Sequence, residues 1–357
     1  MTVPTHDGVT AAAGIAELGA EAQRGRMSYG EGALVVCDQV VRIYTGEGIE
    51  VQALQGLDLL IAQGELVAMV GASGSGKSTL MNILAGLDTP TAGRVRVAGQ
   101  DLGALSAKER LIYRRQQVGF IWQQTSRNLL PYLTAKQNVV MPMRFDGYPR
   151  RLRNARAMDL LDILGVAHCA NRIPSRLSGG EQQRTAIATA LANDPKVLLA
   201  DEPTGELDSR TAQDVFRALQ TVNTELVATV LVVTHDPAVS HQVQRTVAIR
   251  DGRTSSETLR HDAADELGNT VRHAVEYAVL DRVGRVQLPR EMTEQHQMRD
   301  RVLLVSEDDH IGVWADQQAD TGDGDARPRR RAAARHRAGQ HAADQHGAAD
   351  SGTEEGR

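Results

Sequence analysis

The segment Gly71–Thr79 has the residue types and spacing that bind the phosphates of a nucleotide. It fits the pattern G-x-x-x-x-G-K-[ST], in which backbone N–H groups surround a phosphate, Lys77 adds positive charge and Ser78 can bind Mg²⁺. An apolar run at 66–70 and an i, i+3, i+4, i+7 stripe from Leu80 predict a flanking strand and helix, which favours this interpretation over an ordinary Gly- and Ser-rich turn. The phosphate is therefore expected at a helix N-terminus. The predicted nucleotide-binding residues here are Gly71, Ala72, Ser73, Gly74, Ser75, Gly76, Lys77, Ser78 and Thr79.

Two acidic residues follow a second apolar run, and they could hold a metal ion and activate water. Residues 197–200 are apolar, and Asp201 and Glu202 come directly after them. The first carboxylate can bind Mg²⁺ directly or through water, and the second can act as a general base. Paired acids at a strand end are alternatively a helix cap or a solvated turn. A third run, 230–233, ends before Thr234–His235, and the carboxyl ends of such strands should meet beside the phosphate-binding segment.

The segment Leu177–Glu181 reads Leu-Ser-Gly-Gly-Glu and has two interpretations. Ser178, with Glu181 three residues later, forms a capping box and predicts the start of a helix. The two glycines would also leave bare N–H groups at that helix N-terminus, which makes a second phosphate site. A single nucleotide hardly needs two such sites from one chain. The second site is therefore expected to serve a nucleotide bound by another copy.

The order of these segments resembles that of the ATP-binding subunits of ABC transporters, over about residues 34–253. The resemblance implies a homodimer with ATP and Mg²⁺ as cofactors. It makes Tyr44 the aromatic residue that stacks on adenine and Gln123 the glutamine that contacts Mg²⁺ and water. It also makes Asp208 a residue that crosses the dimer and His235 a switch histidine at the γ-phosphate. Taken alone, each residue more often has a structural role: Tyr44 as a strand-edge aromatic, Gln123 as a surface amide, Asp208 as a helix cap and His235 as a turn histidine.

The resemblance completes the set of predicted roles. Glu202 acts as the general base, and Lys77 and His235 stabilise the transferring phosphoryl group. The predicted metal-binding residues are Ser78, Gln123 and Asp201. The residues expected to reach the partner copy's nucleotide are Ser178, Gly179, Gly180 and Asp208.

Within the family, residues 70–84 and 97–102 are most similar to the lipoprotein-releasing and macrolide-exporting ATPases. Two positions depart from that group. Trp122 precedes Gln123 where Phe is usual, and another bulky apolar side chain should be tolerated there. Glu206 stands where that group usually has Asn, which adds a negative charge near the expected dimer interface.

The elements that must position these residues alternate between strand and helix patterns from about residue 34 to 253, which predicts an α/β fold with a mostly parallel sheet. The resemblance makes this a P-loop ATPase fold with an antiparallel β edge. A helical subdomain is expected at about 131–180. Residues 1–33 and 315–357 are poor in large apolar side chains and are expected to be disordered. An Arg-rich run at 327–337 would either stay solvated or contact anionic lipid.

Composition narrows the possible functions. The 357-residue chain has a net charge of −5, which disfavours nucleic-acid binding by the whole protein. Cys37 and Cys169 are the two cysteines; they lack metal-type spacing and suit a reducing cytoplasm. No apolar run approaches the ~20 residues that span a bilayer, and no secretory signal is evident. A membrane role is therefore expected to come through a partner.

Residues 274–314 follow a different pattern: a strand, a helix that begins after Pro289, and two further strands around a turn at 307–309. This segment loosely resembles the swapped-hairpin (AbrB-like) fold of antitoxins and transition-state regulators. A unit so small is expected to pair with a copy of itself. Members of that family bind DNA, but the pattern here favours dimerisation.

These observations predict an ATP-hydrolysing subunit that dimerises and drives separate integral membrane permease subunits. The resemblance implies export or extraction of a lipoprotein, peptide or drug, at the cytoplasmic face of the plasma membrane as a peripheral protein. The alternative is a soluble regulatory or nucleic-acid-directed ABC ATPase that binds through residues 274–314. Soluble relatives usually carry two cassettes or long coiled-coil arms, whereas this sequence has one phosphate-binding segment and no heptad run.

Overall fold

The computed structural model describes residues 29–46, 48–124, 127–264, 270–299, 301–307 and 309–315. The chain divides into two compact units, Met1–Leu288 and Pro289–Arg357. The strands of the first unit are β1 (Ala33–Gly46), β2 (Ile49–Ala62), β3 (Leu66–Val70), β4 (Ala92–Val97), β5 (Gln100–Asp101), β6 (Val118–Ile121), β7 (Val197–Asp201), β8 (Thr229–Val233), β9 (Arg245–Arg250), β10 (Arg253–Ala264) and β11 (Thr270–Ala278). Its helices are α2 (Lys77–Leu84), α3 (Ala107–Gln116), α4 (Ala135–Phe145), α5 (Arg150–Ile163), η2 (Ala167–Cys169), η3 (Pro174–Arg176), α6 (Gly179–Ala190), α7 (Ser209–Glu225) and α8 (Pro237–Ser240).

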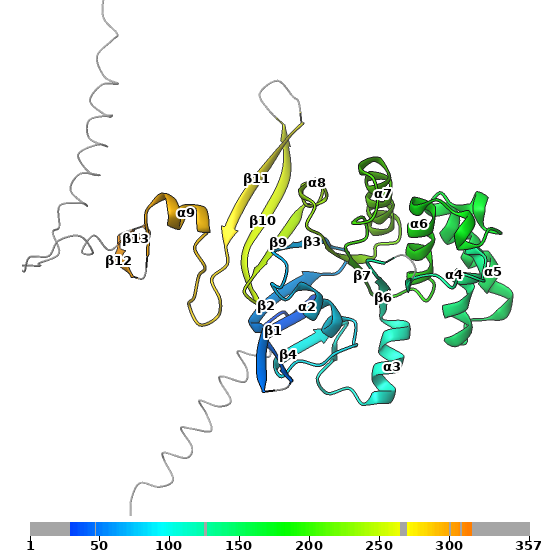
Figure 1. The fold of residues 1–357 in the computed structure, drawn as a ribbon, viewed down its shortest axis with the longest axis horizontal. Helices are drawn as coiled ribbons and strands as arrows, with labels where there is room; N and C mark the ends of the chain where they lie inside the picture. Colours follow the sequence, from blue (N-terminus) through cyan, green and yellow to red (C-terminus); the bar gives the residue numbers. More distant parts are fainter. Residues whose placement is uncertain are drawn as a thin grey trace, which may run out of the picture. The chain divides into compact units, whose positions relative to one another are not determined.

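A mostly parallel sheet forms the centre of this unit (Figure 1). Within the described residues its strand order is β11-β10-β9-β3-β8-β7-β6. The neighbours from β9 to β6 pair in parallel, and β10 and β11 add antiparallel strands at one edge. A smaller antiparallel sheet has the order β2-β1-β4-β5. The predicted α/β fold with a parallel core and antiparallel strands is confirmed.

Successive residues of the central strands pack into two different cores. Ala68 and Leu198 face a core shared with α4, α5, α6 and α7, whereas Met69 and Leu199 face a core shared with α2 and the smaller sheet. All four side chains are fully buried. Because side chains alternate with a period of two, a slip of one residue in any central strand would exchange its two faces. The two cores therefore fix the register of the strands, and with it the positions of the strand ends relative to one another.

Helices α4, α5 and α6 pack against one another, and α6 also contacts α7 and β6. Each of α3, α4 and α6 begins with a capping box, in which a hydroxyl and a Glu or Gln side chain satisfy free backbone N–H groups. The expected apolar stripe Ala157, Leu160, Leu161 and Leu164 is buried against this helical layer.

The end of the chain differs from the expected division at Arg253 and Ala274. Strands β10 and β11 continue the central sheet, and the first unit extends to Leu288. The second unit contains α9 (Arg290–Gln295) and an antiparallel pair, β12 (Val302–Ser306) and β13 (Ile311–Ala315). Dimerisation through residues 274–314 stays a prediction. Most of the expected disordered segments, and the Arg-rich run at 327–337, lie outside the described residues.

Among the described residues, no helix has both the length and the apolar character that crossing a membrane requires.

Two glycines of the smaller sheet provide a matched test of how closely β1 and β4 approach. Gly93 and Gly99 have φ values of 82° and 80°, so alanine is strained at either position. A Cβ at Gly93 would lie 2.2 Å from the Gln39 carbonyl oxygen of β1, whereas a Cβ at Gly99 would meet nothing within 4 Å. We expect Gly93→Ala to lower the free energy of unfolding by about 1–3 kcal/mol more than Gly99→Ala, measured by urea denaturation. Equal losses would contradict the close approach.

Candidate nucleotide-binding site

The predicted phosphate-binding segment connects β3 to α2. The Lys77 ammonium donates hydrogen bonds to the carbonyl oxygens of Gly71 at 2.9 Å and Ala72 at 2.8 Å, and it lies 3.4 Å from the Ser75 hydroxyl. These bonds fold the segment into a ring around a buried positive charge. Gly76, the residue before α2, makes no side-chain cap, and the first turn of α2 has no acidic residue. The N–H groups at this helix N-terminus are therefore placed to receive an anion.

The ends of three further strands bring polar groups together. Glu202 follows β7, and its backbone N–H donates to the Val233 carbonyl of β8 at 2.9 Å. Its carboxylate accepts a hydrogen bond from the Gln123 amide at 3.0 Å and lies 3.2 Å from Nδ1 of His235. Gln123 comes from the segment after β6, and His235 from the segment after β8. Glu202, Gln123 and His235, which are far apart in the sequence, therefore share one small region. The sequence led us to expect that the segments with Glu202 and His235 would meet there, and the catalytic roles of all three residues stay predictions.

Asp201 is the last residue of β7 and is half-buried. Burial raises the pKa of its carboxyl group, the Glu202 carboxylate raises it further, and Lys77 acts in the opposite direction. Among the described residues, no hydrogen bond or ion pair reaches this carboxylate. A desolvated carboxylate with free oxygen atoms is a suitable ligand for Mg²⁺. Ser78 is exposed in the first turn of α2, and the Gln123 amide oxygen could complete such a set.

The segment Leu177–Glu181 adopts the predicted capping box. The Ser178 N–H donates to one Glu181 carboxylate oxygen at 2.7 Å, and the Glu181 N–H donates to the Ser178 hydroxyl at 3.3 Å. The Ser178 N–H bond is the largest cause of the lowered pKa of Glu181. A Cβ on Gly180 would lie 2.5 Å from Cγ2 of Thr211 in α7, so Gly180 allows α6 and α7 to pack closely. The structural interpretation of this segment is thus correct, and its contact with a second nucleotide stays a prediction.

Asp208 is the N-cap of α7. Its carboxylate accepts hydrogen bonds from the backbone N–H groups of Arg210 and Thr211, both at 3.1 Å, and from the Thr211 hydroxyl at 2.6 Å. The Thr211 hydroxyl is the main reason that the pKa of Asp208 is lowered. The alternative interpretation as a helix cap therefore holds, and its position across a dimer stays a prediction. Gly179 is the first residue of α6. Glu206 is exposed and lies in the segment before α7.

Tyr44 has two charged neighbours, Asp88 and Arg42, that no sequence motif marks. Its hydroxyl donates to Asp88 at 2.8 Å, and the Arg42 guanidinium lies 4.5 Å from the centre of its ring. Arg42 also pairs with Asp88 at 2.7 Å. One face of the ring is therefore covered by a cation, which leaves the other for stacking. The signal available in the sequence was the i, i+2 spacing of Arg42 and Tyr44, which places both on the same face of β1.

The fold and these residues define a P-loop nucleotide-binding protein. Residues 54–205 match the family described as ABC transporter. The chain is 40% identical to the ATP-binding cassette MJ0796, solved as a dimer in a post-hydrolysis state bound to ADP and Pi. That match covers 62% of this chain and 97% of the other, with a TM-score of 0.56. The chain belongs to the ABC transporter family, so the predicted family is confirmed.

Two longer relatives are named "Macrolide export ATP-binding/permease protein MacB". The protein of Chromobacterium violaceum is 48% identical over 233 residues, which are 65% of this chain and 35% of that protein. The protein of Shigella flexneri is 46% identical over 236 residues, which are 66% of this chain and 35% of that protein. The chain thus spans about a third of the length of these relatives. The expected similarity to the macrolide-exporting group is also confirmed.

The raised pKa of Asp201 predicts that this residue costs stability. Protonation of Asp201 is more favourable in the folded than in the unfolded state. Relative to an ordinary Asp, the ionised Asp201 therefore lowers stability once the pH is above the folded pKa, and this loss is absent below the unfolded pKa of about 3.9. We expect Asp201→Asn to be more stable than wild type at pH 7 without nucleotide, and the difference to shrink below about pH 4. Thermal unfolding at several pH values measures this. Asp159→Asn, at an exposed position of α5, should show no such difference; a less stable Asp201→Asn at pH 7 would contradict the argument.

Proposed function

We propose that the protein is the ATP-binding and ATP-hydrolysing subunit of an ABC transporter and acts as a homodimer on membrane permease subunits. The observation that carries this proposal is the Glu202 carboxylate, which lies between the Gln123 amide and the His235 imidazole at the ends of β6, β7 and β8. A carboxylate in that setting can accept a proton from water. The Lys77 segment, at the end of the neighbouring strand β3, supplies the place for the phosphates.

In the proposed reaction, ATP lies with its phosphates against Gly71–Thr79 and its adenine on Tyr44. Water attacks the γ-phosphorus, Glu202 takes its proton, and the bond to ADP breaks. Lys77 and His235 stabilise the charge on the transferring group, because phosphoryl transfer depends on positioning and electrostatics. Ser78, Asp201 and Gln123 would hold Mg²⁺, which neutralises phosphate charge when bound. Gln123 and His235 also orient the Glu202 carboxylate through their contacts with it.

Homodimerisation would complete each site. Ser178–Gly180, at the N-terminus of α6, and Asp208, at the N-terminus of α7, would meet the nucleotide of the partner copy. The bare N–H groups of the two glycines suit a phosphate at that position. MJ0796 is itself described as a dimeric cassette. Glu206 would add negative charge close to this contact.

A groove beside Gln123 supports the proposal of a permease partner. Its volume is about 510 Å³, and its lining includes Phe120, Trp122, Leu130 and Phe145. Phe145 and Leu130 are exposed, so the groove offers apolar surface to another chain. A permease segment seated there would adjoin the glutamine that touches Glu202. The MacB relatives, named as macrolide export ATP-binding/permease proteins, favour macrolide-type export. Export of a lipoprotein or peptide, and a place at the cytoplasmic face of the membrane, are proposed from the sequence resemblance.

The segment 274–314 is proposed to help hold two copies together. Pairing of β12 with β13 leaves Leu303, Leu304, Ile311 and Trp314 exposed. An isolated hairpin is marginally stable in water, so a second copy that covers these side chains would stabilise it.

Replacing Glu202 by Gln tests the proposed general base. Glu202→Gln should retain ATP binding, because the Lys77 segment is unchanged, and should lower kcat by about 10²–10⁴-fold. Steady-state ATPase assays and nucleotide-binding titrations measure the two effects. Glu225→Gln, at an exposed position in α7, is the matched control and should keep wild-type activity. Activity of Glu202→Gln within a few-fold of wild type would remove Glu202 from this role.

Mixing inactive variants tests whether each site is shared between two copies. Lys77→Ala and Ser178→Arg should each be inactive alone. A heterodimer of the two has one site with both changes and one with neither, so mixtures should exceed both parents in ATPase activity. A mixture of Lys77→Ala with Glu202→Gln is the control, since every shared site then carries one change and no recovery is expected. Titrated Lys77→Ala and Ser178→Arg mixtures that never exceed their parents would contradict the shared-site proposal.

A further inference from the structure

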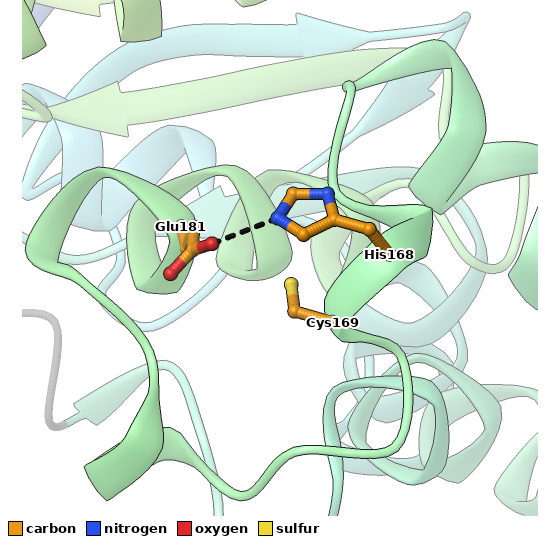
Figure 2. A group of neighbouring side chains, drawn as sticks. All are labelled: His168, Cys169 and Glu181. Carbon is orange, nitrogen blue, oxygen red and sulfur yellow. Dashed lines mark hydrogen bonds and ion pairs between the residues drawn. The ribbon is translucent and has the colours of Figure 1, made fainter.

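Three potential metal ligands meet beside the segment Leu177–Glu181. Figure 2 shows the His168 imidazole of η2 directed toward Glu181 in the first turn of α6, with the Cys169 sulfur, also of η2, near the same imidazole. Nε2 of His168 lies 2.9 Å from Oε1 of Glu181, and the potential ligand atoms of the three residues lie within 4.8 Å of one another. None of the three was a candidate metal ligand in the sequence, because no repeated Cys or His spacing marks them.

The two oxygen atoms of the Glu181 carboxylate have different partners. Oε2 accepts the hydrogen bond of the Ser178 N–H at 2.7 Å and so caps α6. Oε1 faces His168, and Nη1 of Arg172 lies 4.0 Å from it. Arg172 is half exposed and at the limit of an ion pair, so it can turn into solvent. Oε1 is therefore available to a ligand without loss of the helix cap.

The Cys169 thiol is buried within the core that the helices share, and its Sγ donates to the Val166 carbonyl at 3.1 Å. The His168 side chain is 57% exposed. A metal ion could thus enter from the solvent side, past His168, and reach a sulfur atom that is protected from bulk water.

We propose that His168, Cys169 and Glu181 form a Zn²⁺ site, through Nε2, Sγ and Oε1. Imidazole, thiolate and carboxylate are the three side-chain ligands that zinc prefers, and three protein ligands leave one position for water. Zinc bonds of 2.0–2.3 Å place tetrahedral ligands about 3.3–3.8 Å apart, so small side-chain rotations suffice. When the metal binds, the thiol proton leaves for solvent and the bond to the Val166 carbonyl is lost. This site goes beyond the proposed ATPase function, and its test needs no ATP.

Titration of the full chain with Co²⁺ alone tests the proposal, because a cobalt–thiolate bond has its own charge-transfer absorption. The wild-type chain should bind about one equivalent with this absorption, and Zn²⁺ should displace it. His168→Gln and Cys169→Ser should each weaken binding at least tenfold, and Cys169→Ser should abolish the absorption. The control is Cys37→Ala, which removes the other buried free cysteine and should bind as wild type.

A second measurement keeps the test independent of the optical signal. Zn²⁺ should raise the Tm of wild type and of Cys37→Ala, since a ligand that binds the folded state stabilises it. His168→Gln changes an exposed side chain and should fold normally, yet its Tm should not respond to Zn²⁺. Three outcomes would overturn the proposal: no thiolate absorption in wild type, binding that survives both His168→Gln and Cys169→Ser, or an equal Tm response in His168→Gln.

Discussion

The phosphate-binding segment, the paired acids and His235 all depend on a central sheet that is packed on both faces. Ala68 and Met69 face different cores, as do Leu198 and Leu199, so the strands cannot shift without exchanging their buried sides. Backbone bonds continue the same register beyond the strand ends, where the Thr234 N–H donates to the Met69 carbonyl at 3.1 Å. Because the register fixes where each strand ends, the phosphate-binding segment, the paired acids and His235 meet at one edge of the sheet.

The site itself opposes folding. Glu202 has a φ of 46°, which is left-handed backbone for a residue with a side chain. Burial, and after it the Glu202 carboxylate, raises the pKa of the half-buried Asp201 next to it. Such strain persists where the surrounding structure outweighs it. Here the Val233 carbonyl, the Gln123 amide and the His235 imidazole hold Glu202 in place. Packing of the two cores therefore offsets the free energy that the strained backbone and the close carboxylates cost.

Local patterns made much of this molecule predictable. Gly71–Thr79 and the capping box of Ser178 each depend on residues within a few positions, and their local structures appear as expected. Contacts between distant segments were not visible in the sequence. The contacts of Asp88 with the Tyr44 hydroxyl and of Glu181 with His168 are set by how strands and helices pack, and β11 joins the central sheet only because β10 pairs with β9. No local pattern in the sequence marks which distant residues will come into contact in this way.

The glycines of the phosphate-binding segment are required by close packing against neighbouring backbone as well as by a bound phosphate. A Cβ on Gly71 would lie 2.3 Å from the Ile249 carbonyl oxygen, and one on Gly76 would lie 2.5 Å from that of Ala53. A duplicated gene copy released from selection for hydrolysis would still need these glycines in order to fold. Position 202, whose backbone is strained, would instead be free to drift toward Gly or Asn. Among related genes in one genome, the residue at position 202 should therefore distinguish copies that hydrolyse ATP from copies that have lost hydrolysis better than the glycine pattern does.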